Sequence, residues 1–136
     1  MTMRNFTAVV GLFVLVLVAP GMKASAEDIP NLVGVWGGTN ETVADGFKLK
    51  SSPRTVHITE QTDRRFRGHF DYAGGHKEIF GIIFPDNVSF AWVATISKGQ
   101  VQGRILSPNH IAACYIESGP EATAGCSDLK RTAEKP

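Results

Sequence analysis

Residues 65–72 read Arg-Phe-Arg-Gly-His-Phe-Asp-Tyr, the clearest alternation of charged and aromatic side chains in the chain. Successive side chains of a β-strand point to opposite faces of a sheet. The segment therefore predicts a strand that buries Phe66, Phe70 and Tyr72 and leaves its charged side chains in water. Because a shift of one residue would expose the whole apolar set, this strand also orients its neighbours.

Similar short segments, rich in aromatic and β-branched residues, recur on both sides of this strand and are separated by turn residues. No helical period persists after Asn31. The segment from Thr39 to Pro53 is interpreted as a long exposed loop, and the other connections are as short as those of consecutive antiparallel hairpins. Eight strands are predicted, over residues 32–38, 54–60, 64–72, 77–84, 87–94, 99–106, 110–117 and 124–132.

The lengths of the turns predict how these strands pair. They set Ile58 opposite Phe66 and Ile79 opposite Phe70, and they leave the polar residues of each strand on the outer face. Eight strands in simple succession can pair the first with the last, which removes both exposed edges. The predicted fold is all-β: an eight-stranded antiparallel up-and-down barrel, just wide enough to be filled by side chains or to hold one small ligand.

The first 26 residues have the composition of a secretory signal peptide. Arg4 precedes an apolar run from Phe6 to Ala19, and Ala24-Ser25-Ala26 supplies the small residues that signal peptidase requires. The run is shorter than the ~20 residues that span a bilayer, so no membrane span is expected after processing. We predict a periplasmic or secreted protein whose mature chain, residues 27–136, is a single domain.

Charge and cysteine content narrow the function. Of 14 basic residues, Arg4 and Lys23 lie in the signal peptide, which leaves 12 against 13 acidic ones, too even a balance for a nucleic-acid-binding surface. Cys114 and Cys126 would meet an oxidising compartment, so a disulfide between them is expected. Two free thiols are the alternative, and the separation of 12 residues is typical of neither a zinc site nor a redox motif.

The first predicted strand begins Leu-Val-Gly-Val-Trp, ending at Trp36, and the last carries Arg131. A Gly-x-Trp on the first strand with an Arg on the last resembles the hallmark of the calycin barrels, which include lipocalins, fatty-acid-binding proteins and avidins. In that group the Trp closes one end of the barrel, and in lipocalins the Arg stacks across it. The resemblance implies that Trp36 and Arg131 plug one barrel end. The alternative is a chance Gly-x-Trp and a solvated Arg131.

The same layout is similar to that of the bacterial periplasmic inhibitors of secreted metalloproteinases, which start L-x-G-x-W after a short arm. The resemblance implies that the arm, here Glu27 to Asn31, enters a protease cleft and contacts it through Glu27, Asp28 and Ile29. This chain differs from the family in placing its cysteine pair near the C-terminus rather than near the first strands.

Motifs for catalysis or cofactor binding are absent from the sequence, which contains no G-x-S-x-G, H-E-x-x-H, P-loop or dinucleotide fingerprint. A non-catalytic protein without a cofactor is therefore predicted. His57, His69 and Asp71 fall on the outer face of two adjacent strands, where a surface metal site is conceivable. Arg67, which the predicted pairing sets opposite His57, would repel a cation, so a solvated polar face is the favoured interpretation.

Small inward residues indicate space inside the barrel. Gly68, Gly81, Gly103 and Ala113 share one predicted layer, so a pocket for a small apolar or aromatic ligand is one interpretation. The alternative, favoured by the close packing of protein interiors, is that the aromatic ring of Phe90 fills the gap. The pocket would be bounded by Phe66, Phe70, Phe90, Trp92 and Tyr115.

An outward row of large apolar residues, Phe80, Ile82 and Phe84, predicts a surface for a protein partner or a homodimer. The alternatives are a bulge in that strand or a cover formed by Phe47 from the long loop. Together these features predict an exported, non-catalytic binding protein. Its partner is a protease or another exported protein in the first hypothesis, and a small apolar ligand carried inside the barrel in the alternative.

Overall fold

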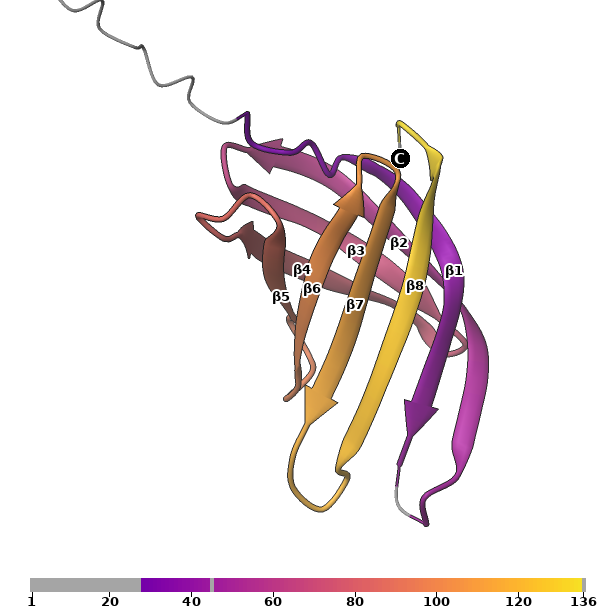
Figure 1. Cartoon of the computed structure of the whole chain (residues 1–136). Coiled ribbons are helices and arrows are strands. Elements are labelled where there is room, and N and C mark those ends of the chain that lie inside the picture. Colours follow the sequence, from indigo (N-terminus) through magenta and orange to yellow (C-terminus); the bar gives the residue numbers. More distant parts are fainter. Residues whose placement is uncertain (1–27, 45, 136) are drawn as a thin grey trace, which may run out of the picture.

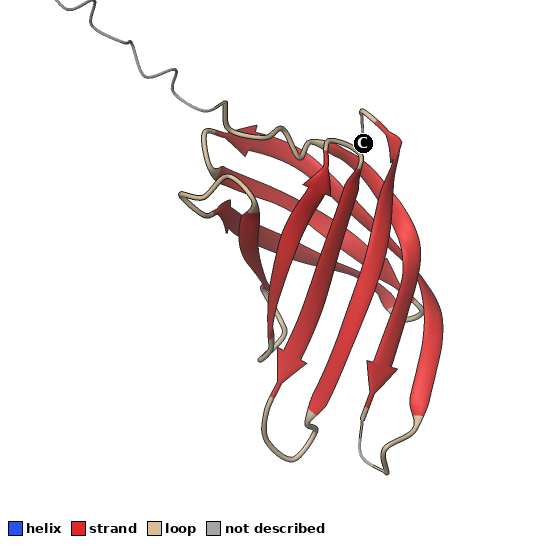
Figure 2. Cartoon of the chain, in the orientation of Figure 1, coloured by secondary structure: helices blue, strands red, loops and turns tan. Residues whose placement is uncertain are grey.

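The computed structural model describes residues 28–44 and 46–135, which form one closed barrel of antiparallel strands (Figure 1). Each strand pairs with its sequence neighbours, and the first pairs with the last, as predicted. No residue of the described part is helical (Figure 2), so it holds no helix that could cross a membrane. The predicted signal peptide lies outside the described residues. The strands are β1 (Gly34–Val43), β2 (Leu49–Thr62), β3 (Arg65–Tyr72), β4 (Gly75–Ile83), β5 (Ser89–Ala94), β6 (Gln100–Ser107), β7 (His110–Glu117) and β8 (Thr123–Ala133).

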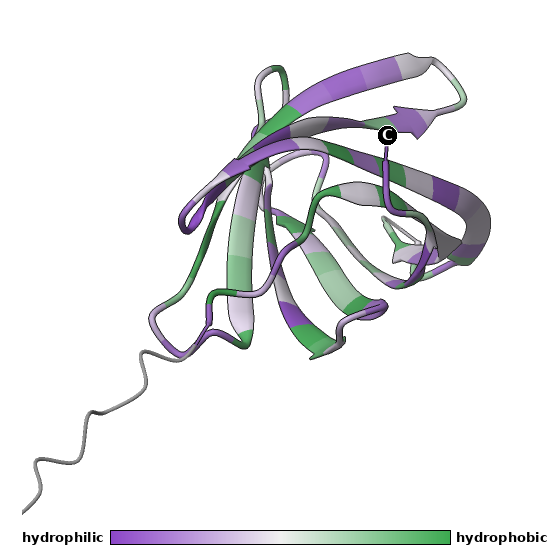
Figure 3. Cartoon of the chain, turned by 90° about the horizontal axis from the view of Figure 1, so that it is seen from above, coloured by the Kyte–Doolittle hydropathy of each residue, from purple (hydrophilic) through white to green (hydrophobic). Residues whose placement is uncertain are grey.

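The core lies inside the barrel because apolar and polar residues alternate along the strands, as the hydropathy colours of Figure 3 show. Each strand contributes at least one inward apolar side chain, and each such side chain stabilises the fold by about 1.5–3 kcal/mol when fully buried. The fully buried apolar side chains are those of Leu32, Trp36, Val56, Ile58, Ile79, Ile83, Phe90, Ile111 and Leu129.

The prediction of a long loop from Thr39 to Pro53 is wrong. These two residues face each other, and the pairing of β1 with β2 continues as far as Val43 and Leu49. The inward side chains of this extension are polar, as at Asn40, which is only 6% exposed. A strand whose inner face is hydrophilic has no apolar alternation, which is why the sequence pattern indicated a loop.

The predicted pairing of β3 with its neighbours is wrong by two residues on each side. Phe70 faces Val56 and Lys77 rather than Ile79, because each hairpin turn is tighter than predicted. On the β2 side the tight turn sets Phe66 opposite Gln61, and a bulge next to Ile58 then sets Ile58 opposite Gly68. Beyond the bulge the shift is even, so side chains keep their predicted faces despite the different partners. The predicted burial of Tyr72 is wrong, because this side chain lies at the end of β3 and is 42% exposed.

Cys114 and Cys126 form a disulfide between directly opposite positions of β7 and β8. Both residues alternate with inward ones, Ala113 and Ser127, so the bond lies on the outer surface. The bond links the two strands of the β7–β8 hairpin, which forms one wall of the barrel interior.

Candidate ligand-binding site

Trp36 lies near the start of β1 and pairs with Arg131 on β8. Its indole is fully buried, and Nε1 donates a 2.9 Å hydrogen bond to the carbonyl of Leu32. The guanidinium of Arg131 lies over the ring, 4.2 Å from its centroid. Burial lowers the pKa of Arg131 below its usual value, but an Arg remains charged at neutral pH. A cation over an indole face contributes about 0.5–2 kcal/mol.

Arg131 also ties two separate segments together across this end. It donates hydrogen bonds of 2.7 Å to the carbonyl of Asn31 and 3.0 Å to that of Pro108, and a further bond of 3.1 Å to the side chain of Asn109. The segment before β1 is thereby held against the turn between β6 and β7, and it crosses the upper end of the barrel in Figure 1.

The middle of the barrel is filled by aromatic rings. A Cβ atom on Gly81 would clash with the ring of Phe66, and one on Gly103 would clash with the ring of Phe90. Gly81 and Gly103 therefore accommodate rings rather than leave space, whereas a Cβ atom on Gly68 would meet the backbone of β2. This corrects the predicted pocket boundary at Phe66 and Phe90, and it agrees with the alternative that Phe90 fills the gap.

A cavity of about 250 Å³ remains in the other half of the barrel, toward the ends of β1, β3, β5 and β7, and it is partly open to solvent. For comparison, an apolar cavity of roughly 150 Å³ takes up benzene. Three of the predicted pocket residues line it, namely Phe70, Trp92 and Tyr115. The other lining residues are Asn40, Thr42, Arg54, Val56, Tyr72, Lys77, Ser97, Val101, Ala113, Thr123, Gly125, Ser127 and Leu129.

The wall formed by β2, β3 and β4 alternates cations with aromatic rings. The guanidinium of Arg54 lies 4.8 Å from the centroid of Phe70, and Nζ of Lys77 lies 5.2 Å from that of Tyr72. Arg54 is half-buried, and this burial lowers the pKa of its guanidinium. Among the described residues, no carboxylate lies within ion-pair distance of either cation.

The facing walls supply neutral polar groups. Ser127 on β8 donates a 2.8 Å hydrogen bond to the buried amide oxygen of Asn40 on β1, whose nitrogen donates to Thr42 at 2.7 Å. The Tyr115 hydroxyl donates to Glu117 and lies 2.8 Å from the hydroxyl of Ser97. Burial and the bond to Glu117 raise the pKa of Tyr115, so its hydroxyl stays protonated at neutral pH.

The electrostatic character of the cavity follows from these groups. Within the described part of the chain, the lining comprises two cations, several hydroxyls and an amide, but no acidic residue. A partly desolvated cation without a partner is costly unless an anion joins it. The cavity is therefore suited to a small molecule with an apolar body and a negatively charged group.

The sequence reasoning missed Arg54 and Lys77, although the signal was present. Arg54 lies two residues before the inward Val56, and Lys77 two residues before the inward Ile79, so alternation alone places both side chains inside. A cation at the start of a strand is usually solvated, so residue type alone does not indicate that these two side chains face inward. Thr42 and other polar lining residues of β1 were missed because they fall in the segment interpreted as a loop.

The predicted outer row is exposed in the structure. Phe80 is 56% exposed, Ile82 48% and Phe84 38%, and β4 pairs with β5 without a bulge. Phe47 does not cover the row, since its side chain is 91% exposed. Both alternative explanations of the row are thus removed.

The predicted inhibitory arm is described only in part. Glu27 lies outside the described residues, whereas Asp28 and Ile29 are exposed ahead of the barrel. The chain is fastened from Pro30 onward, because its carbonyl accepts a 2.9 Å hydrogen bond from the side chain of Gln61. Inhibition of a protease through this arm stays a prediction.

Comparison with known proteins gives a likeness of fold only. No family model matches the chain, and no curated protein matches it in sequence. Among solved structures, it is similar to the S-type phycobiliprotein lyase CPES from Guillardia theta, at 12% identity and a TM-score of 0.47, over 74% of this chain and 88% of that one. It is also similar to EF1p2_mFAP2b bound to DFHBI, at 14% identity and a TM-score of 0.45, over 74% of this chain and 94% of that one.

Proposed function

We propose that this chain is an exported binding protein that holds a small amphiphilic anion in the open half of its barrel. The observation that carries the proposal is the cavity of about 250 Å³, in which Arg54 and Lys77 face no described carboxylate. A carboxylate, sulfonate or phosphate on the ligand would complete the charge balance of this wall. The apolar side chains of Trp92, Val101 and their inward neighbours would contact the apolar body of the ligand.

Apolar burial and charged hydrogen bonds are both expected to contribute to the free energy of binding. Burial of the apolar body contributes roughly 25 cal/mol per Å² of apolar surface removed from water. A hydrogen bond to a charged group contributes about 1.5–3 kcal/mol, close to a tenfold or greater change in affinity. The anionic group is therefore expected to decide which of two similar ligands binds, while the ring body supplies affinity common to both.

Calorimetric titration with two matched probes tests this function. Naphthoate carries a carboxylate on a naphthalene body, and naphthalenemethanol has the same body without the charge. We expect the wild-type protein to prefer naphthoate by about tenfold or more. Substitution Arg54→Met, which keeps the apolar stem of the side chain, is expected to remove most of this preference while leaving the affinity for naphthalenemethanol similar.

Two further variants control the experiment. Lys130→Met removes a cation from the outer face of β8 and is expected to leave both affinities unchanged. Ala113→Leu fills part of the cavity from β7 and is expected to weaken both probes. Equal affinity of the wild-type protein for the two probes would refute the preference for anions, and equal binding by wild type and Ala113→Leu would place the probes elsewhere.

A second candidate function, self-association, rests on the exposed row of Phe80, Ile82 and Phe84. Contiguous apolar side chains on a soluble surface mark contact sites, because burying each one is favourable. We expect the wild-type protein to sediment as a dimer at high concentration and a Phe80→Ser, Ile82→Thr variant to sediment as a monomer. A wild-type protein that stays monomeric over the same concentration range contradicts this candidate and leaves the cavity proposal untouched.

A further inference from the structure

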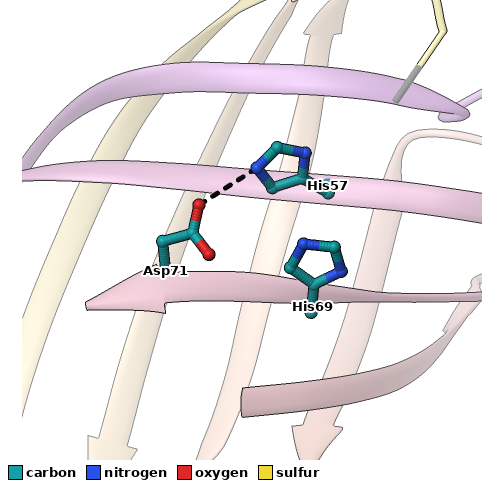
Figure 4. Close-up of side chains that lie close together, drawn as sticks. All are labelled: His57, His69 and Asp71. Atoms are coloured by element: carbon teal, nitrogen blue, oxygen red, sulfur yellow. Dashed lines mark hydrogen bonds and ion pairs between the residues drawn. The ribbon is translucent and has the colours of Figure 1, made fainter. Parts of the chain in front are cut away.

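A cluster of imidazole and carboxylate groups lies on the outer face of β2 and β3. His57 on β2 faces His69 on β3, and their rings stack with centroids 4.5 Å apart. Asp71 follows on the same face of β3, and its Oδ2 lies 3.1 Å from Nε2 of His57. All three side chains project from the same side of the two strands (Figure 4). Their candidate ligand atoms lie within 4.8 Å of one another.

The observed pairing removes the objection that Arg67 raised against a metal site. Arg67 was predicted opposite His57, but the tight turn between β2 and β3 places it opposite Glu60. Nε of Arg67 donates a 2.8 Å hydrogen bond to the Glu60 carboxylate. Its charge is therefore balanced, and His69 separates it from Asp71 along β3.

We propose that His57, His69 and Asp71 bind a divalent transition-metal ion of the zinc or copper(II) class. Two imidazole nitrogens and one carboxylate oxygen suit these ions, whereas Mg²⁺ and Ca²⁺ prefer oxygen ligands throughout. Zn–N bonds of about 2.0–2.1 Å set tetrahedral ligands roughly 3.4 Å apart, so the ligand atoms must draw closer by somewhat over an ångström. Rotation of the side chains supplies this movement, because the two histidines are half-buried and Asp71 is exposed.

His76 on β4 is placed to become a fourth ligand. It pairs with Asp71 across the β3–β4 ladder, and its ring centroid lies 5.6 Å from that of His69. Glu78, 3.8 Å from Nε2 of His76, can orient this imidazole as carboxylates orient metal-ligating histidines elsewhere. An ion bound by the three histidines and Asp71 would cross-link β2, β3 and β4. It would lie on the outside of the wall whose inner face carries Arg54 and Lys77.

Titration of the tag-free protein with zinc chloride and with copper(II) chloride tests the site. We expect one ion to bind per chain and the affinity to fall by at least about tenfold in His57→Ala and in His69→Ala. The electron paramagnetic resonance spectrum of the copper(II) form is expected to show coupling to at least two nitrogen nuclei, and to one fewer in each variant.

His110 provides the matched control. Like His57, it is a half-buried outer-face histidine that pairs with an aspartate, Asp128, but no cluster of three ligands forms around it within the described residues. His110→Ala is expected to leave the metal affinity and the copper spectrum unchanged. The proposal is overturned if His57→Ala binds zinc as tightly as the wild type, or if His110→Ala loses as much affinity. Thermal unfolding of the metal-free proteins verifies that each variant is folded. If an alanine variant does not fold, the metal affinity of His69→Asn is measured in its place.

Discussion

Substitution Trp36→Ala is expected to lower the free energy of unfolding by about 3–5 kcal/mol, because it empties a fully buried site of its largest side chain. It also removes the Nε1 hydrogen bond to Leu32 and the surface over which Arg131 lies. Urea denaturation followed by circular dichroism measures the change. Trp36→Phe keeps an aromatic ring in the barrel end and is expected to lose clearly less.

Arg131→Met separates the contribution of the cation from that of the indole. It keeps an apolar stem over the ring but loses the cation–π contact and the hydrogen bonds to Asn31 and Pro108. We expect a loss of about 1–2 kcal/mol, smaller than that of Trp36→Ala. An unfolding midpoint of Trp36→Ala equal to that of the wild type would show that this end of the barrel does not depend on the plug.

Removal of the disulfide by the double substitution Cys114→Ala and Cys126→Ala is expected to cost about 3 kcal/mol, as the chain-entropy account gives for a short closed loop. Both side chains lie on the outer surface, so little core packing is lost with the sulfur atoms. The same hairpin contributes Ala113 and Ser127 to the cavity, so naphthoate affinity is expected to fall as well.

The reduced wild-type protein serves as a comparison for the double variant, and their unfolding curves should coincide. Gln102→Ala, at the outward position opposite Cys114 on β6, is expected to change the stability by no more than about 0.5 kcal/mol. A double variant as stable as the oxidised wild type would contradict this prediction. It would mean that the disulfide does not measurably restrict the unfolded chain.

The faces of the strands could be predicted from the sequence, because a single alternating segment fixes which side chains lie inside. Phe66, Phe90 and Ile111 are buried as expected. The exact partners could not be predicted, because turn length and a bulge set the pairing and neither leaves a clear pattern in the sequence. An error of two residues is invisible to alternation, which is why the predicted partner of Phe70 was wrong while its face was right.

The candidate site was harder to predict than the fold because its chemistry departs from the usual rule for interiors. Apolar residues indicate the core, so the sequence predicts a pocket bounded by aromatic residues, of which Phe66 and Phe90 fill the barrel instead. The groups that give the cavity its character are cations and a buried amide, at Arg54, Lys77 and Asn40. Polar residues can be assigned to the interior of a barrel only once the sheet is known to close around them.

The pairing of β1 with β8 means that the barrel can close only at the end of synthesis. Val35 pairs with Ala133, so the two margins of the sheet meet only after nearly the whole polypeptide has been synthesised. Until then β1 and β7 each present an unpaired edge, and contacts between such distant parts of a chain form slowly. Thr123, Gly125 and Ser127 of β8 belong to the cavity wall, so ligand uptake is expected only from chains that have finished this last step.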